Sequence, residues 1–176
     1  MIHQQQIERA GLADIHAKVV DGQRLSADDG IRLYESADLP ILGYLANLGR
    51  EARHGDTTYY VRNQHINYTN ICNKLCKFCS FYVKPKDERG YVLDPEQVAK
   101  RVTDYAEVPI TEIHMVGGVN PKLPYKYYLD VLQAMKQARP EAHLKAFTMI
   151  EVAQIQRIAK KPLAEVFADM RRVGLE

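Results

Sequence analysis

Three times after residue 63, a short strand-like run gives way to a longer helical pattern. The expected strands cover residues 64–69, 111–116 and 143–148, and apolar residues at helical spacing follow each of them. Units of about 30 residues in this order are typical of parallel strands joined by right-handed crossovers. The sequence therefore predicts an α/β fold in which the loops that follow the strands share one edge of a parallel sheet.

Helix-start signals agree with this division. Asp94 suits an N-cap with Pro95 in the first turn, and Pro162 begins a last helix that Gly174 ends. A further helix is expected over residues 125–138, and another after the third strand, through Ile158. Three strands are too few to close a barrel, and residue 176 falls where a fourth strand should begin. We expect the front half of a longer protein.

The first third of the chain has a different pattern. Residues 7–20 predict one helix, Ser26 and Asp29 resemble a capping box that opens a second, and Pro40 suits the first turn of a third. Residues 57–62 are rich in β-formers and predict an extra hairpin strand. The expected organisation is a helical lead-in over residues 1–56, followed by three β/α units over residues 57–176.

Charge and hydropathy exclude several classes of partner. Lysine and arginine number 24 against 22 acidic residues, a net charge of +2, so no basic surface for nucleic acid or an anionic membrane is expected. No apolar run reaches the ~18 residues that span a bilayer. The N-terminal residues lack the basic start and apolar core of a secretion signal. A cytoplasmic protein with a small-molecule substrate is expected.

All three cysteines lie in one short loop after the first expected strand. Cys72, Cys76 and Cys79 have the form C-x3-C-x2-C, and three thiolates so spaced can each bind one iron of a [4Fe–4S] cube, leaving the fourth iron open. The alternatives are a zinc site completed by His65 or His114, a disulfide with a spare thiol, or buried structural cysteines. The cluster is favoured, because no second pair of zinc ligands exists and an odd number of crowded cysteines does not suit a disulfide framework.

With Phe78 as the aromatic residue before the last cysteine, this loop resembles that of the radical S-adenosylmethionine (SAM) enzymes. The resemblance implies a partial (β/α)6 TIM-like barrel, a [4Fe–4S] cluster, SAM, and a one-electron reductant such as flavodoxin or ferredoxin. Gly117 and Gly118 after the second strand match the glycine motif that meets the amino group of the cofactor's methionine. Glycine would let the backbone approach a ligand closely.

The same resemblance suggests further cofactor contacts, each with a structural alternative. Phe78 would pack beside the adenine or shield the cluster, and Ser80, Phe81 and Tyr82 would line the adenine edge or pack within the loop. Thr148 and Glu151 would meet the ribose or substrate, although Thr148 also suits a helix N-cap. Lys145 would pair with a substrate carboxylate if strand alternation turns it to the barrel interior. His65, Asn67 and Asn70 would reach the substrate or orient the cysteine loop, and a lone histidine on a strand also suits a structural role.

Within the superfamily, the sequence is similar to the futalosine-pathway enzymes of menaquinone biosynthesis, with FO synthase as a cousin. The similar segments are Arg53–Asp56, Ile66–Asn70, Cys79–Tyr82, Val116–Gly118, Leu123–Tyr125 with Tyr127–Tyr128, and Lys145–Thr148. Within this group, the resemblance to the aminofutalosine synthases is greatest in the segments His114–Gly118 and Lys145–Thr148. Those enzymes add a 5′-deoxyadenosyl radical to 3-[(1-carboxyvinyl)oxy]benzoate. The cyclic dehypoxanthine futalosine synthases and FO synthases are the alternatives.

Two departures qualify this resemblance. Asn120 stands where family members usually have histidine, and the later strands with their Pro-Gly-Gly-Gly-Ala-Glu segment are missing. Part of the cofactor site and most of the substrate site would come from those strands. We therefore expect the 176-residue chain alone to be inactive, as a half-barrel that at most binds a cluster.

Overall fold

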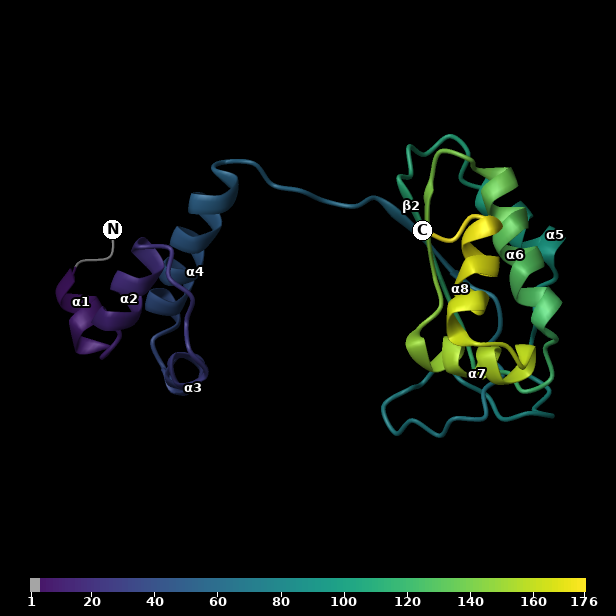
Figure 1. Ribbon diagram of the computed structural model, residues 1–176, viewed down its shortest axis with the longest axis horizontal. Helices are drawn as coiled ribbons and strands as arrows, with labels where there is room; N and C mark the ends of the chain where they lie inside the picture. Colours follow the sequence, from purple (N-terminus) through teal and green to yellow (C-terminus); the bar gives the residue numbers. More distant parts are fainter. Residues whose placement is uncertain (1–3) are drawn as a thin grey trace. The chain divides into compact units, whose positions relative to one another are not determined.

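The computed structural model describes residues 4–176 and divides into two compact units (Figure 1). The first ends at Tyr60 and the second is Val61–Glu176, so the division lies four residues beyond the expected boundary at 56/57. Residues 1–3, which belong to the N-terminal stretch in which no secretion signal was expected, lie outside the described residues. Within residues 4–176 no helix is long and apolar enough to cross a membrane.

The first unit is helical, as expected, but its first helix is divided. Its elements are α1 (Gln4–Arg9), α2 (Ala13–Val20), α3 (Ala27–Glu35) and α4 (Leu39–His54). The prediction of one helix over residues 7–20 is wrong, because Gly11 takes a φ of +67° that turns the chain between α1 and α2. A small apolar core joins these helices: Ile7, Leu12, Ile15, Ile41 and Leu45.

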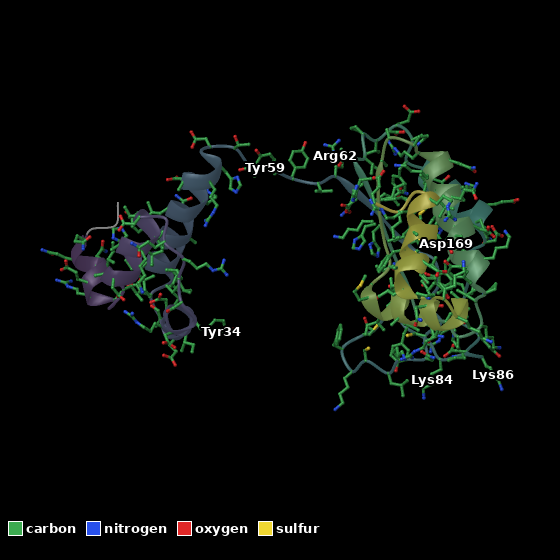
Figure 2. The ribbon with its side chains drawn as sticks, in the orientation of Figure 1. Tyr34, Tyr59, Arg62, Lys84, Lys86 and Asp169 are labelled. Atoms are coloured by element: carbon green, nitrogen blue, oxygen red, sulfur yellow. The ribbon has the colours of Figure 1, made fainter. Side chains whose placement is uncertain are left out.

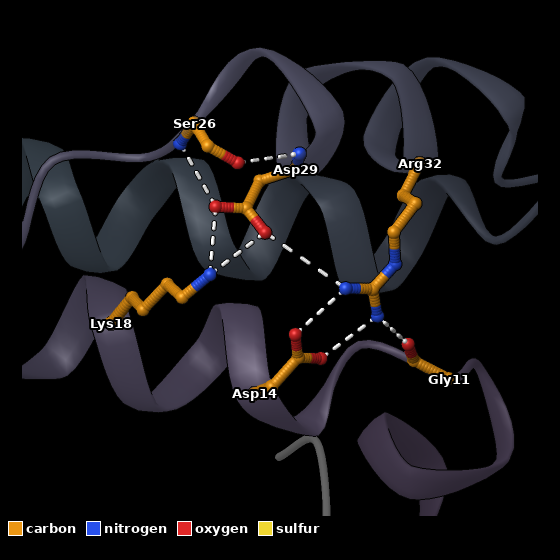
Figure 3. Close-up of polar contacts among 6 residues, drawn as sticks. All are labelled: Gly11, Asp14, Lys18, Ser26, Asp29 and Arg32. Carbon is orange, nitrogen blue, oxygen red and sulfur yellow. Dashed lines mark hydrogen bonds and ion pairs between the residues drawn. The ribbon is translucent and has the colours of Figure 1, made fainter.

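Ion pairs connect α2 to α3 in this unit (Figure 3). The predicted capping box is confirmed, since Ser26 Oγ accepts from the Asp29 amide and the Asp29 carboxylate accepts from the Ser26 amide. The buried Asp29 also receives Lys18 Nζ at 2.9 and 2.8 Å. The bond from Lys18 lowers the pKa of the Asp29 carboxyl to about 2. Arg32 binds Asp14 through two nitrogens, at 2.7 and 2.8 Å, and holds the pKa of that carboxyl below its ordinary value.

The segment between α4 and the sheet forms no strand. Residues 57–62 were expected to pair as a hairpin strand, and that expectation is wrong. Their β-formers have no neighbouring strand with which to build a ladder, and β-propensity stabilises little without one. Figure 2 shows Tyr59 projecting from this segment, where the Tyr59 and Tyr60 side chains are 79% and 80% exposed.

The second unit is built on a three-stranded parallel sheet, which confirms the predicted α/β class. Its strands are β1 (Asn63–Asn67), β2 (Glu112–Val116) and β3 (His143–Ala146), in the order β1-β2-β3. The ladder places His65 beside His114 and His114 beside Lys145. The helices are α5 (Pro95–Thr103), α6 (Tyr125–Ala138), α7 (Met149–Ala159) and α8 (Leu163–Arg172).

The two faces of this sheet differ sharply. On one face, strand residues such as Ile66, Ile113 and Leu144 are buried in a core that the four helices complete (Figure 1). The residues between them point to the opposite side. These form what we call the polar face: Asn63, His65, Asn67, Glu112, His114, Val116, His143 and Lys145.

Local signals fix where the chain turns from strand to helix. Asp94 caps α5 in a capping box with Gln97, as predicted for its Asp-Pro start. Strand β3 stops earlier than expected, because Phe147 takes a left-handed φ of +65° and turns the chain directly into the N-terminus of α7. This early turn brings the first residues of α7 to the carboxyl edge of the sheet, where the loops after β1 and β2 also lie.

Candidate cofactor site

The cysteine loop leaves β1 and returns to its own starting point. Bridges join Thr69 to Val92 and Ile71 to Val83, and they tie the outgoing limb of the loop to its return limb. The buried Asn70 reinforces this, since its amide nitrogen donates to the Arg89 carbonyl and its amide oxygen accepts from the Tyr91 amide. The loop therefore has a fixed stem, from which the segment between Cys72 and Tyr82 extends.

The three thiols are free and differ in exposure. Cys72 is buried at the stem, and its Sγ accepts the Lys74 and Val119 amides, each at 3.3 Å. Cys79 is partly buried and Cys76 is exposed, with a turn that joins the Cys79 amide to the Cys76 carbonyl. The disulfide alternative does not form. Among residues 4–176, no three cysteine, histidine or acidic side chains lie close enough together to hold a metal ion. The exposed tip of the loop, between Cys72 and Tyr82, would therefore have to rearrange to bring the three thiols around a cluster.

The residues predicted to meet the adenine lie on the exposed tip. Phe78 is 92% exposed, so it shields nothing in this structure, and Ser80 and Phe81 are also exposed. Tyr82 is partly buried where the loop returns. Their proposed contacts with the cofactor stay a prediction.

The Gly-Gly loop packs directly on the stem of the cysteine loop. A Cβ on Gly118 would lie 2.3 Å from the Ile71 carbonyl oxygen, and one on Gly117 would lie 2.7 Å from the Tyr68 ring. The Gly118 amide donates to the Thr69 carbonyl at 2.8 Å. In this structure, glycine is therefore required by packing between the two loops, a reason different from the ligand approach expected from the sequence. Within residues 4–176 neither glycine carbonyl accepts a hydrogen bond.

A buried carboxylate at the start of α7 completes this arrangement. Glu151, 2% exposed, accepts four hydrogen bonds: from the Tyr68 hydroxyl at 2.8 Å, the Gly117 amide at 3.0 Å, and the Thr148 amide and hydroxyl at 2.7 and 2.8 Å. Burial and the nearby Glu151 raise the pKa of Tyr68, so this phenol stays a donor. Thr148 is the N-cap of α7, which is the structural role that the sequence also allowed for it. A direct contact of Thr148 or Glu151 with a cofactor stays a prediction.

Two residues that hold the site together carry no signal in the sequence. Val119 gives its amide to the Cys72 sulfur, a backbone bond that leaves no mark on residue type. Tyr68 joins the Gly-Gly loop to Glu151, although its sequence position suggests only the end of a strand. Asn120, the departure from the family pattern, is buried, and its side-chain oxygen accepts the Lys122 amide, so it serves the turn after the Gly-Gly loop.

Both loops and all three strands' carboxyl ends fall within residues 66–173, which match the radical SAM superfamily. The chain belongs to that superfamily, whose enzymes use a [4Fe–4S] cluster and SAM. It is 39% identical over 165 residues to the aminodeoxyfutalosine synthase of Thermus thermophilus, covering 94% of this chain and 44% of that relative. It is 36% identical over 160 residues to the cyclic dehypoxanthine futalosine synthase of Halalkalibacterium halodurans, covering 90% and 43%.

The fold agrees with this assignment. The [FeFe]-hydrogenase maturase of Carboxydothermus hydrogenoformans superposes with a TM-score of 0.62 at 18% identity, over 89% of this chain and 38% of that one. The α/β fold is thus part of a radical SAM TIM-like barrel. The chain spans less than half the length of the curated relatives it matches.

The residues present fit the cofactors of the superfamily. Thiolates are the ligands that iron–sulfur clusters prefer, and the three cysteines stand on one loop beside Lys74 and Lys77. Two backbone amides already point at the Cys72 sulfur, and such bonds stabilise a ligating thiolate. The free carbonyls of the Gly-Gly loop are acceptors, which suits the ammonium group of a methionine.

Proposed function

We propose that the chain carries the cofactor-binding front half of an aminodeoxyfutalosine synthase. That enzyme transfers the 5′-deoxyadenosyl group of SAM to the double bond of 3-[(1-carboxyvinyl)oxy]benzoate, with methionine as the other product of SAM. Rearrangement and loss of the enolpyruvyl carboxyl group then give 6-amino-6-deoxyfutalosine. The observation that carries the proposal is the match over 94% of this chain to a relative of that name, which includes both loops of the site. The segments His114–Gly118 and Lys145–Thr148 favour this reaction over those of cyclic dehypoxanthine futalosine synthase and FO synthase.

Each loop would have a separate task. Cys72, Cys76 and Cys79 would ligate three irons, and the carbonyls of Gly117 and Gly118 would accept from the amino group of SAM. When bound and reduced by one electron, the cluster and SAM supply a 5′-deoxyadenosyl radical. The electron would come from a flavodoxin or ferredoxin. Free thiols suit the reducing cytoplasm expected from the sequence.

The decisive experiment uses a chimera. Residues 1–176 replace the matching front segment of the Thermus thermophilus relative, and the purified, anaerobically reconstituted protein receives SAM, dithionite and 3-[(1-carboxyvinyl)oxy]benzoate. We expect mass spectrometry to find 6-amino-6-deoxyfutalosine with the chimera and none with the 176-residue chain alone. A chimera that folds, binds a cluster and forms only a cyclic futalosine or deazaflavin product, given the matching substrates, would contradict the proposal.

A second experiment tests whether the three cysteines ligate the cluster. Cys76→Ala, at an exposed position where alanine disturbs no core, should abolish the cluster, because three protein ligands are already the minimum. Iron and sulfide analysis with electron paramagnetic resonance measures this. A full iron–sulfur complement in Cys76→Ala would show that Cys76 is not a ligand.

A further inference from the structure

The polar face of the sheet has the wrong composition for a packed barrel interior. Inward-pointing residues of closed β/α barrels are mostly bulky and branched, so that side chains fill the inside. Here Val116 is the one apolar member of the eight positions that define the face. Residues such as His65 and Lys145 are exposed on it, whereas the helix-covered face is closely packed. A face of this composition suits contact with a polar ligand better than contact with an apolar core.

A cross-strand row on this face brings three nitrogen-bearing side chains together. His65, His114 and Lys145 are direct neighbours in the ladder, one from each strand. The two imidazole rings meet edge to face, with centroids 5.3 Å apart. The amide oxygen of Asn67 can only accept, so His65 Nε2 donates to it at 3.0 Å, which fixes the orientation of the His65 ring.

Two members of the row have their polar atoms available. Among the described residues, the His114 side chain forms no hydrogen bond, and the Lys145 side chain forms neither a hydrogen bond nor an ion pair. Adjacent strands lie about 4.8 Å apart, so a group that bridges two neighbouring strands can reach both side chains at once. The size and the two acceptor oxygens of a carboxylate suit such a position.

The charged side chains on the polar face are distributed unevenly between the amino and carboxyl ends of the strands. The next row toward the amino ends holds Glu112 and His143, and His143 pairs with Glu176 at 2.9 Å. Carboxylates therefore gather at the amino ends, and the ammonium group of Lys145 lies nearer the carboxyl ends, where both loops of the cofactor site begin. The row is two residues, or about 7 Å, from the ends of β1 and β2. An anion that enters from the cofactor edge would meet the row before it meets Glu112.

We propose that His114 and Lys145 bind a carboxylate group of the substrate, an aryl or enolpyruvyl acid, on the polar face. Lys145 forms the ion pair, the His114 ring donates an N–H, and His65, held by Asn67, orients His114. This rests on the proposed function for the identity of the acid. The site itself rests on the register, the ring contact and the available polar atoms.

The test measures binding of benzoate to the 176-residue chain by NMR of its histidine rings, with benzamide as the uncharged match. We expect benzoate to shift the His114 signals and benzamide to leave them in place. Lys145→Met keeps most of the length of the side chain and removes its charge, and it should weaken benzoate binding at least tenfold. His65→Phe loses the bond to Asn67 but keeps the ring contact that orients His114, so it should bind benzoate within about twofold of the unaltered chain. A tenfold loss in this variant would show that the His65 nitrogens themselves take part in binding, against the role given to His65.

Lys126→Met is the control for a lost lysine charge, since Lys126 is exposed on α6 and, among residues 4–176, pairs only with Asp130. It should bind benzoate as the unaltered chain does, and thermal melts check that every variant is folded. Equal shifts with benzoate and benzamide, no shift with either, or undiminished binding by folded Lys145→Met would each overturn the inference. Benzoate binding with no futalosine product from the chimera would reject the proposed function alone. Product formation with an unchanged KM for the acid in Lys145→Met would reject the carboxylate site alone.

Discussion

Glu151 is the residue on which the cofactor loops most depend. Its carboxylate receives donors from the end of β1, the Gly-Gly loop and the N-cap of α7, so one side chain joins parts of all three β/α units. Glu151→Gln would replace one acceptor oxygen by an NH2 group that faces existing donors. A buried donor left without a partner costs about 1–3 kcal/mol, and we expect the free energy of unfolding of the second unit to fall by about that much.

Urea denaturation monitored by the tyrosines of this unit measures the loss. Glu165→Gln is the control, because Glu165 is exposed in the first turn of α8 and should tolerate the change. Hydrogen exchange at the Gly117 amide should also become faster in Glu151→Gln. Equal stability and equal exchange in the two variants would show that the buried carboxylate does not hold the loop.

Gly118 gives a second prediction for a single residue. Alanine there would place a Cβ 2.3 Å from the Ile71 carbonyl, so the backbone of the stem must move. We expect Gly118→Ala to lower the melting temperature by several degrees and to reduce the iron bound on reconstitution, because Cys72 follows Ile71. Gly30→Ala, within α3 and with open space around it, should instead stabilise by about 0.5–1 kcal/mol. Normal iron content in Gly118→Ala would contradict the coupling of the two loops.

Among the elements, the pairing of α2 with α3 depends on pH. Because the pKa of Asp29 is about 2 in the folded chain and 3.8 ordinarily, its ion pair stabilises fully above the ordinary value and is lost as pH falls through about 2. The lowered pKa of Asp14 acts in the same direction. We expect hydrogen-exchange protection of α3 to decrease between pH 5 and pH 2.

Asp29→Asn should show weaker protection of α3 already at pH 5, and a smaller further loss on acidification. Asp28→Asn is the matched control, one residue earlier in the same first turn but exposed and without an ion pair among the described residues. It should behave like the unaltered chain. Similar pH profiles in Asp29→Asn and the unaltered chain would mean that this carboxylate does not carry the acid sensitivity.

Elements held by local bonds were predictable from the sequence, and long-range contacts were not. Capping signals involve residues close together in the sequence: the capping box of Ser26 and Asp29 predicted one helix start, and Asp94 followed by Pro95 predicted another. Strand order located both cofactor loops at one edge. The bond from Tyr68 to Glu151 spans 83 positions and follows no periodicity, so the sequence offered no sign of it. The strand predicted over residues 57–62 does not form for a related reason: composition shows β-propensity but does not show whether a partner strand lies beside the segment.

At the scale of the whole molecule, the second unit has helices on one face of its sheet and the polar face on the other. Along the strands, acidic groups lie toward the amino ends and the cofactor loops lie at the carboxyl ends. On the outer side of β3, the Leu144 carbonyl accepts the Glu176 amide at 3.1 Å, so residues after α8 return to the sheet edge. If the proposed carboxylate site is right, the substrate reaches the polar face from the carboxyl edge of the sheet, where the two cofactor loops lie. Both loops fall within residues 66–173, which match the radical SAM superfamily.

The division into two units predicts where a protease cuts first. Tyr59 and Tyr60 are exposed on a segment without helix or strand, and a protease must bind its substrate in an extended form. Limited chymotrypsin digestion should therefore cut after Tyr59 or Tyr60 and release fragments that end and begin near the boundary at 60/61. Tyr34 is an internal control, since it is 95% exposed but lies within α3. Mass spectrometry of the first fragments decides: cleavage at Tyr34 before Tyr59 and Tyr60, or protection of both tyrosines, would show that residues 57–62 are held in a regular structure after all.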